Sequence, residues 1–349
     1  MERSGKPRKV LVARFSALGD VAMSVPVVYS ACHANPDCEF FFLTKIHAAS
    51  LFVNTPANLT VVGIDTSAYE GISGIRRLAS ELKAKYGIEA FADLHDVLRT
   101  KLLRLFLGLS GIRCRHIHKG RRGKKALTRA RRKVFLPLTS TRMRYREVFH
   151  ALGLSYADSF DGIFAGSPPS QDDFSEASAP KKPGETWIAI APFAGHPGKI
   201  YPPELMERVI EALCKRPGYR IFIFGAGQKE TNMIGRWTMK YDNIVNMGAL
   251  STGIPAELAL MYWCDAMISM DSANMHLASL AGTRVVSVWG ATHPYCGFLG
   301  WRQKKEDSVQ LDMVCRPCSV FGDKPCRFGD CHCMHGIPPK MILDTLDRR

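Results

Sequence analysis

Short apolar runs alternate along this chain with longer segments in which apolar residues recur every three or four positions. The first pattern is typical of buried strands and the second of amphipathic helices. In the first half it predicts strands over 9–15, 39–43, 59–64, 88–93 and 112–117, and helices over 21–34, 47–54, 72–86 and 97–109. Strands that alternate with helices predict a parallel sheet with right-handed crossovers.

A polar segment over residues 167–186, rich in Pro, Ser and charge, interrupts this pattern and has the composition of a linker. The alternation then restarts with strands over 187–191, 220–224, 244–245, 266–269 and 284–288, and helices over 203–214, from about 228, 256–264 and 274–281. We therefore expect an α/β protein of two doubly wound, Rossmann-like domains. Two such domains that face each other would form a ligand cleft at the carboxyl ends of their strands.

Composition is consistent with this reading. A chain of 349 residues has the length of about two domains, and 46% hydrophobic with 23% charged residues is ordinary for a globular protein rather than a disordered one. The first twenty residues lead into a strand and contain no evident cleavage site, and no apolar run approaches the ~18 residues of a spanning helix. We expect a cytoplasmic protein whose contact with a membrane is confined to its surface.

Charge is distributed very unevenly. The formal net charge is +15, yet the stretch 113–146 alone holds 14 Lys and Arg and no acidic residue. The rest of the chain has 33 basic against 32 acidic residues. A local field of this size gathers phosphates or other anions, so nucleic acid, an acidic membrane surface and an anionic substrate all fit it.

Asp20 follows the first predicted strand in the segment Ser16-Ala17-Leu18-Gly19-Asp20, at the start of a helix. Gly19 permits a tight strand-to-helix turn, and Asp20 would point from the helix N-terminus toward the carboxyl edge of the sheet. The simpler interpretation is that Asp20 only caps the helix by accepting from first-turn amides.

A second loop, residues 270–276, joins the strand 266–269 to the helix 274–281. Asp271 or Ser272 can cap this helix, and the amides near Ser272, Ala273 and Asn274 would form a phosphate-binding site. A plain capped turn explains the same residues. His276 is either a ligand to the site or a packed helix residue, which is the commoner fate of a histidine.

Lys199 lies in the loop 195–202, before a helix that begins with prolines. There a lysine can offer a point charge to a leaving phosphate, although an ordinary solvated lysine has the same local sequence. The chain has no strict D-x-D pair, P-loop, G-x-S-x-G or H-E-x-x-H motif, and Gly225-Ala226-Gly227 lacks the third glycine of a dinucleotide fingerprint.

Taken in order, these loops resemble glycosyltransferase family 9, the heptosyltransferase family of lipopolysaccharide assembly. The resemblance runs from about residue 9 to 342. Four segments carry it: VLVARFSALGD (10–20), GHPGKIYPPE (195–204), MDSANMHLASLAG (270–282) and VVSVWGATHP (285–294). It implies a GT-B fold, with an acceptor-side domain over 1–166, a nucleotide-sugar domain over 187–336 and a C-terminal helix, 337–349, that packs on the first domain.

The resemblance also implies inverting, metal-independent transfer of a sugar, heptose from ADP-heptose, onto a lipopolysaccharide-core acceptor, with no cofactor. It makes Asp20 the general base and Lys199 the cation that neutralises the departing diphosphate, which suits the chemistry of both groups. The donor would be held by Asp271, Ser272, Ala273, Asn274, His276, Gly195 and Thr292. Ala273 and His293 depart from the family pattern, which commonly has glycine and an acidic residue at these positions.

The basic stretch becomes the acceptor side under this interpretation, with Arg121, Arg122, Lys124 and Lys125 drawn to an anionic glycolipid at the inner membrane surface. A non-catalytic protein that binds nucleic acid through 113–146 is an alternative, although the most basic part of the stretch, 119–133, has no interleaved aromatic residues and the chain shows no known binding module. A GT-B nucleotide-sugar epimerase is another. The oligomeric state is not predicted.

Five cysteines crowd into residues 315–333 in the pattern C-x2-C-x7-C-x4-C-x-C. In a cytosolic chain they are expected to be reduced. Two interpretations stay open: packing thiols, or a structural zinc site at Cys315, Cys318, Cys326 and Cys331.

Overall fold

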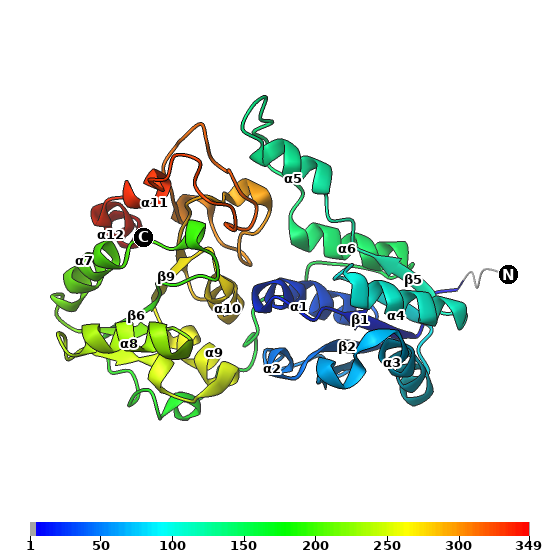
Figure 1. Cartoon of the computed structure of the whole chain (residues 1–349). Helices are drawn as coiled ribbons and strands as arrows, with labels where there is room; N and C mark the ends of the chain where they lie inside the picture. Colours follow the sequence, from blue (N-terminus) through cyan, green and yellow to red (C-terminus); the bar gives the residue numbers. More distant parts are fainter. Residues whose placement is uncertain (1–4, 349) are drawn as a thin grey trace. The chain divides into compact units, whose positions relative to one another are not determined.

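The computed structural model describes residues 5–348 and divides them into two compact units. Unit 1 contains the residues up to Lys119 together with Thr139–Ile163, and unit 2 contains Gly120–Leu138 together with the residues from Phe164 onward. Figure 1 shows that each unit has its own sheet and its own helices. The prediction of two parallel-sheet α/β units is confirmed.

Unit 1 is built on a parallel sheet of five strands in the order β3-β2-β1-β4-β5. These strands are β1 (Lys9–Ala13), β2 (Glu39–Lys45), β3 (Leu59–Ile64), β4 (Ala90–Asp93) and β5 (Arg113–His116). Between and after them lie α1 (Leu18–His33), α2 (Ile46–Ala49), α3 (Gly71–Tyr86), α4 (Leu98–Leu109) and α6 (Thr141–Ala151). This is the Rossmann strand order, in which the chain reverses direction across the sheet beside β1.

Both faces of this sheet are covered, which explains why its strands have nearly continuous apolar sequences. Leu11, Phe41 and Phe91 point to one face and pack against α3 and α4. Phe40 on the opposite face meets Phe149 of α6 at 6.5 Å between ring centroids, and α1 is buried from Val21 to Cys32. The loop after β1 therefore leaves the sheet at its carboxyl edge and enters a firmly packed helix.

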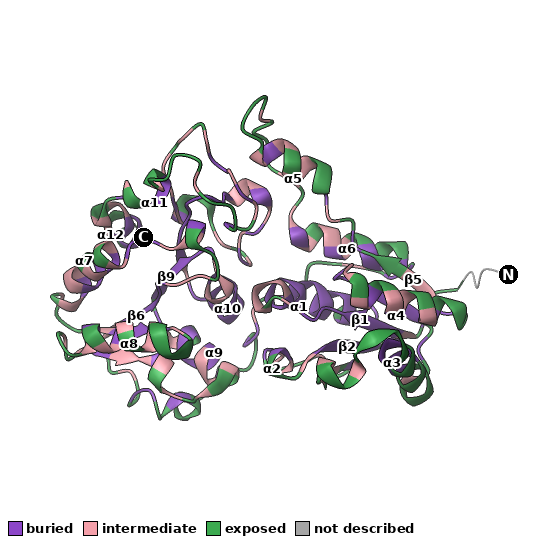
Figure 2. Ribbon diagram, in the orientation of Figure 1, coloured by how far each residue is buried: buried purple, intermediate pink, exposed green. Residues whose placement is uncertain are grey.

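Unit 2 repeats the arrangement with six parallel strands in the order β11-β10-β9-β6-β7-β8. They are β6 (Thr186–Ala191), β7 (Tyr219–Ile223), β8 (Ile244–Asn246), β9 (Ala266–Met270), β10 (Val285–Val288) and β11 (Ser308–Val309). The helices are α5 (Arg121–Thr128), α7 (Pro203–Cys214), α8 (Gly227–Thr238), α9 (Gly253–Trp263), α10 (Ala273–Ala281), α11 (His332–His335) and α12 (Pro339–Asp347). Figure 2 shows β9 buried within this unit.

The core of unit 2 lies between the sheet and the helices α7, α8 and α12, with Ile190, Ile223 and Ile268 contributed by the strands. The other face carries Trp187, which meets Phe222 at 4.9 Å and Phe174 at 6.0 Å between ring centroids. Because β9 is central, the loop that follows it is held by the most deeply buried strands of the unit.

The basic stretch corrects the expected domain boundary, because 120–138 packs with unit 2 rather than within a first domain over 1–166. The physical reason is a set of contacts from Lys133, whose Nζ donates to the carbonyls of residues 314–317 at 2.8–3.2 Å. Leu138 N donates to Tyr295 O at 2.9 Å, and the Phe135 ring lies 5.1 Å from that of His293.

Two further boundaries differ from expectation. The segment 167–186 is not a free linker, because Trp263 donates to Pro169 O at 3.2 Å and Lys181 pairs with Asp265 at 2.7 Å. The C-terminal helix α12 packs within unit 2, not on the first domain as the family resemblance implied. Its Ile342 and Leu346 join the unit 2 core, and Asp347 pairs with Arg216 at 2.7 Å.

No helix within residues 5–348 is long and apolar enough to cross a membrane.

Candidate active site

Asp20 lies in the first turn of α1, directly after the loop that leaves β1. Its Oδ2 accepts from the backbone N–H of Ala17, the N-cap residue, at 3.2 Å. Asp20 therefore helps to cap the helix from its first turn, but it is not the N-cap residue that the simpler interpretation expected. The same oxygen forms an ion pair with Nη2 of Arg14 at 2.5 Å. Within residues 5–348, Asp20 Oδ1 accepts no hydrogen bond. The carboxylate is therefore fixed through one oxygen and presents the other.

Arg14 is the group that holds Asp20 in place. Its side chain is 9% exposed, whereas that of Asp20 is 28% exposed, and its Nη1 donates to Leu94 O at 2.8 Å. Burial opposes the charge of the guanidinium, but Tyr145 and Asp20 raise the pKa of Arg14 above its usual value. Sequence analysis missed this residue, although an arginine at the end of an apolar strand is the signal that could have found it.

His95 is a second residue that sequence analysis missed. It follows β4, is buried, and its backbone N–H donates to Asp93 Oδ1 at 2.9 Å. Burial, together with the positive charge of Arg14, lowers the pKa of His95 to about 3. The imidazole is therefore neutral at physiological pH, and its buried Nδ1 has no hydrogen-bond partner within 5–348.

In unit 2, Lys199 and Asp271 meet as a second ion pair. Lys199 ends the short 3-10 helix Pro197–Lys199, and Asp271 directly follows β9. Lys199 Nζ lies 2.9 Å from Asp271 Oδ2, with the side chains 14% and 5% exposed. The contact lacks the angles of a hydrogen bond, so Oδ2 has a charge partner but no hydrogen-bond donor within 5–348. The structure thus brings together two residues that lie far apart in sequence.

The helix α10 begins beside this pair. Ser272 is its N-cap residue, but the Ser272 side chain makes no capping hydrogen bond; its Oγ lies 3.3 Å from Ser269 Oγ instead. Ser272 thus occupies the N-cap position, as one of the two expected alternatives had it, but its hydroxyl makes no hydrogen bond to the first-turn amides of α10. Those amides and the helix dipole favour an anion at this end of the helix. Ala273 and Asn274 are half-buried there.

The remaining predicted donor residues differ in their surroundings. Thr292 is fully buried, and its Oγ1 has no hydrogen-bond partner within 5–348. His276 is 6% exposed within α10 and packs as a helix residue. Gly195 is exposed, and no contact recorded for residues 5–348 ties it to Lys199 or Asp271.

The predicted acceptor residues lie on α5 in unit 2, so the structure does not group them with Asp20. Arg121, Arg122 and Lys125 are exposed. Lys124 differs from them because its Nζ lies over two aromatic rings, 4.9 Å from the centroid of Phe298 and 5.6 Å from that of Phe321. Three of the four predicted acceptor cations are therefore exposed, and the fourth packs against two aromatic rings.

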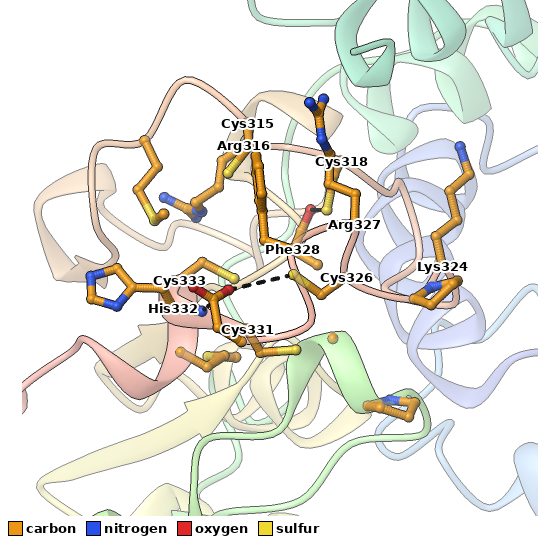
Figure 3. A pocket seen from close by; sticks show the side chains of 17 residues that line it. Cys315, Arg316, Cys318, Lys324, Cys326, Arg327, Phe328, Cys331, His332 and Cys333 are labelled. Atoms are coloured by element: carbon orange, nitrogen blue, oxygen red, sulfur yellow. Dashed lines mark hydrogen bonds between the residues drawn. The ribbon is translucent and has the colours of Figure 1, made fainter.

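The five cysteines of 315–333 line one cavity of about 70 Å³, together with Gly198, Arg316 and Phe328. Figure 3 shows their side chains around this space. All five are free thiols. Yet no group of three or more Cys, His, Asp or Glu side chains in residues 5–348 is placed to hold a metal ion. The structure brings the predicted zinc ligands to one pocket but does not arrange them as a coordination site.

Comparison with known proteins gives a family match. The sequence model of glycosyltransferase family 9 (heptosyltransferase) matches residues 75–328. Lipooligosaccharide heptosyltransferase 2 of Campylobacter jejuni is 25% identical over 144 residues, which is 39% of this chain and 43% of that protein. The chain thus spans less than half the length of that relative.

Longer matches have lower identity. Lipopolysaccharide heptosyltransferase 1 of Pseudomonas aeruginosa is 22% identical over 326 residues, 89% of this chain and 86% of that protein. The solved ADP-heptose lps heptosyltransferase II of E. coli superposes with a TM-score of 0.66 at 18% identity, covering 97% of both chains. The latter match confirms the fold predicted from the sequence.

Proposed function

The chain belongs to glycosyltransferase family 9, and from this premise we propose that it transfers heptose from ADP-heptose to an anionic lipopolysaccharide-core acceptor, with inversion at the anomeric carbon. The observation that carries the proposal is the Lys199–Asp271 pair at the uncapped start of α10. A cation and free helix amides at one place are what a departing diphosphate requires. The name of the E. coli structural relative supports the choice of donor.

In the proposed reaction, a hydroxyl oxygen of the acceptor attacks the anomeric carbon of the donor. Asp20 Oδ1 accepts the hydroxyl proton, because Oδ2 is already engaged by Arg14 and Ala17. Arg14 holds this carboxylate in a fixed orientation, which suits a general base. Asp271, which is nearly buried, would accept hydrogen bonds from donor sugar hydroxyls.

As the new bond forms, the bond between the anomeric carbon and the diphosphate oxygen breaks, and its electron pair stays on that oxygen. Lys199 and the first-turn amides of α10 stabilise the charge that develops there. These groups can serve the role that a divalent cation serves elsewhere, so we propose that transfer needs no metal ion. ADP then leaves, and the proton ends on Asp20.

We further propose that α5 recruits the acceptor. Arg121, Arg122 and Lys125 are exposed cations on a single eight-residue helix, suited to phosphates or carboxylates of a glycolipid. Each basic residue near an anionic membrane surface contributes ~1 kcal/mol, so this helix would also favour peripheral attachment to the inner membrane.

The experiment is an ADP-release assay on the purified chain with a panel of ADP-, UDP- and GDP-sugars, each with and without a lipopolysaccharide-core glycolipid. We expect release only from ADP-heptose, only with acceptor, and without loss in EDTA. NMR of the product should show the anomeric configuration opposite to that of the donor. Processing of the donor without acceptor would favour an epimerase, and salt-sensitive retention of nucleic acid on filters would favour a nucleic-acid-binding protein.

A further inference from the structure

The loop that follows Arg316 packs against the segment that carries Lys199. Gly198 N donates to Gly322 O at 3.2 Å, and Ala291 N donates to Gly198 O at 2.9 Å. Ala291 O in turn accepts from Cys318 N at 3.0 Å. These backbone bonds join the Lys199 segment, the loop after β10 and the cysteine-lined loop shown in Figure 3.

Gly322 lies against the Lys199 side chain. A Cβ at position 322 would lie 2.6 Å from Cγ of Lys199, and 3.3–3.4 Å from its Cε and Cδ. The Lys199 side chain therefore runs past the side of Gly322 on which any other residue would carry its Cβ. Since Cγ is close to the lysine backbone, it cannot yield to a new methyl group without redirecting the rest of the side chain, including the ammonium that meets Asp271.

A compact turn fixes Gly322 in this position. The hydroxyl of Ser319, fully buried, accepts from Gly322 N at 2.9 Å and from Phe321 N at 3.2 Å, and it donates to Asp323 Oδ1 at 2.5 Å. Gly322 itself has a φ of +77°, in the left-handed region that favours glycine. The turn therefore places a residue without a side chain next to Lys199.

We propose that Gly322 is a positioning residue for transfer: it holds Lys199 in the path that places its ammonium at Asp271 and the start of α10. The inference rests on the proposed role of Lys199 at the departing diphosphate. A lysine carries its charge on a flexible four-carbon stem, and confining that stem beforehand reduces the entropy lost when the transition state forms. A displacement of about 1 Å in a catalytic group can cost up to ~100-fold in rate.

The test compares Gly322→Ala with Gly329→Ala in the full-length protein. Gly329 is a matched control because it lies in the same loop with a φ of +79°, but a Cβ there would meet nothing within 4 Å. Both variants place a Cβ at a residue of similar positive φ, and only the first Cβ meets Lys199. We expect kcat to fall roughly 10- to 100-fold in Gly322→Ala and to stay within about two-fold of wild type in Gly329→Ala, with similar melting temperatures in both variants.

A double-mutant cycle separates positioning from a general structural effect. In a Lys199→Ala background, Gly322→Ala should change the residual kcat by less than about two-fold, because the side chain it displaces is gone. An equal loss in both backgrounds, or wild-type kcat in Gly322→Ala, overturns the inference. If Gly322→Ala does not fold, Ser319→Ala, which frees the two amides without adding an atom, is carried through the same cycle with the same criteria.

The outcome also distinguishes this inference from the proposed function. Wild-type turnover in Lys199→Ala would remove the role of Lys199 at the diphosphate and with it this inference, while heptose transfer itself would stand. Absence of acceptor-dependent ADP release from the wild-type chain would instead refute the proposed function. Impaired turnover in Lys199→Ala with normal turnover in Gly322→Ala would refute the positioning role alone.

Discussion

Each unit carries an ion pair between a basic residue and an aspartate, and the two pairs differ in which partner is more exposed. In unit 1 the cation Arg14 is 9% exposed and the carboxylate of Asp20 is 28% exposed. In unit 2 the carboxylate of Asp271 is 5% exposed and the cation Lys199 is 14% exposed. The more accessible partner is an anion in one unit and a cation in the other, on sheets of the same strand order.

This difference shows how one fold supports two kinds of chemistry. A carboxylate that is oriented by a buried arginine can accept a proton, whereas a lysine that is oriented by a buried carboxylate can stabilise a leaving anion. The fold supplies the same strand-to-helix loops in both units. In each ion pair, the buried partner leaves the other charge accessible to a ligand: the aspartate in unit 1 and the lysine in unit 2.

The largest predicted effect comes from removing the exposed anion. Asp20→Ala should lower kcat about 10³-fold, since general-base catalysis contributes typically 10²–10⁴-fold. Steady-state ADP release with acceptor present measures this, and circular dichroism controls for folding. Turnover within three-fold of wild type would exclude Asp20 as the base.

Removing Lys199, the more accessible partner of the unit 2 pair, should have the next largest effect. Lys199→Ala is expected to lower kcat about 10²-fold, the usual loss when one charge-stabilising donor is deleted. Lys181→Ala, which removes another lysine paired with an aspartate in unit 2, is the control and should retain turnover. Comparable losses in both variants would mean that stability, not leaving-group chemistry, is affected.

A smaller effect is expected at α5. Reversing charge at Arg121, Arg122 and Lys125 to Glu should raise the acceptor KM about ten-fold at low salt while the ADP-heptose KM stays constant, because surface charges mainly steer an anionic partner. The difference from wild type should shrink as salt rises. A shifted donor KM would assign these cations to the donor instead.

The smallest effect concerns stability in acid. The pKa of His95 is about 3 in the folded protein and ~6.5 in an unfolded chain, so the unfolded state binds a proton first as the pH falls below ~6.5. His95 therefore destabilises the fold between about pH 6.5 and 3, and this penalty is absent at neutral pH. Urea titrations of His95→Gln should show a loss of unfolding free energy between pH 7 and 4.5 that is about 2–3 kcal/mol smaller than in wild type. An identical loss in the two proteins would contradict this.

Local patterns predicted much of the fold. The strand over 59–64 and the helix over 203–214 match the structure residue for residue, because each is an apolar pattern closed by clear turn residues. The helix Thr141–Ala151 was not predicted, since basic residues dominate it and its apolar side chains are buried only by packing such as that of Phe149 on Phe40.

The domain boundary around 120–138 could not be read from local sequence. It depends on Lys133 reaching carbonyls more than 180 residues later in the chain, and no local pattern encodes such a contact. The same holds for the site. Asp20, Lys199 and Asp271 were predicted from their loops and a family resemblance. Arg14 carried only the weak signal of an arginine at the end of an apolar strand, and Gly322 gains meaning only from the Lys199 side chain beside it.

The affinity of ADP for Asp20→Asn and for Lys199→Met, measured side by side by calorimetry, tests the division of roles most directly. We predict that Asp20→Asn binds ADP within two-fold of wild type and that Lys199→Met binds it at least ten-fold more weakly, because only the second substitution removes a phosphate-binding charge. Equal weakening in both variants, or normal ADP binding by Lys199→Met, would contradict the assignment of the carboxylate to the acceptor and the lysine to the donor.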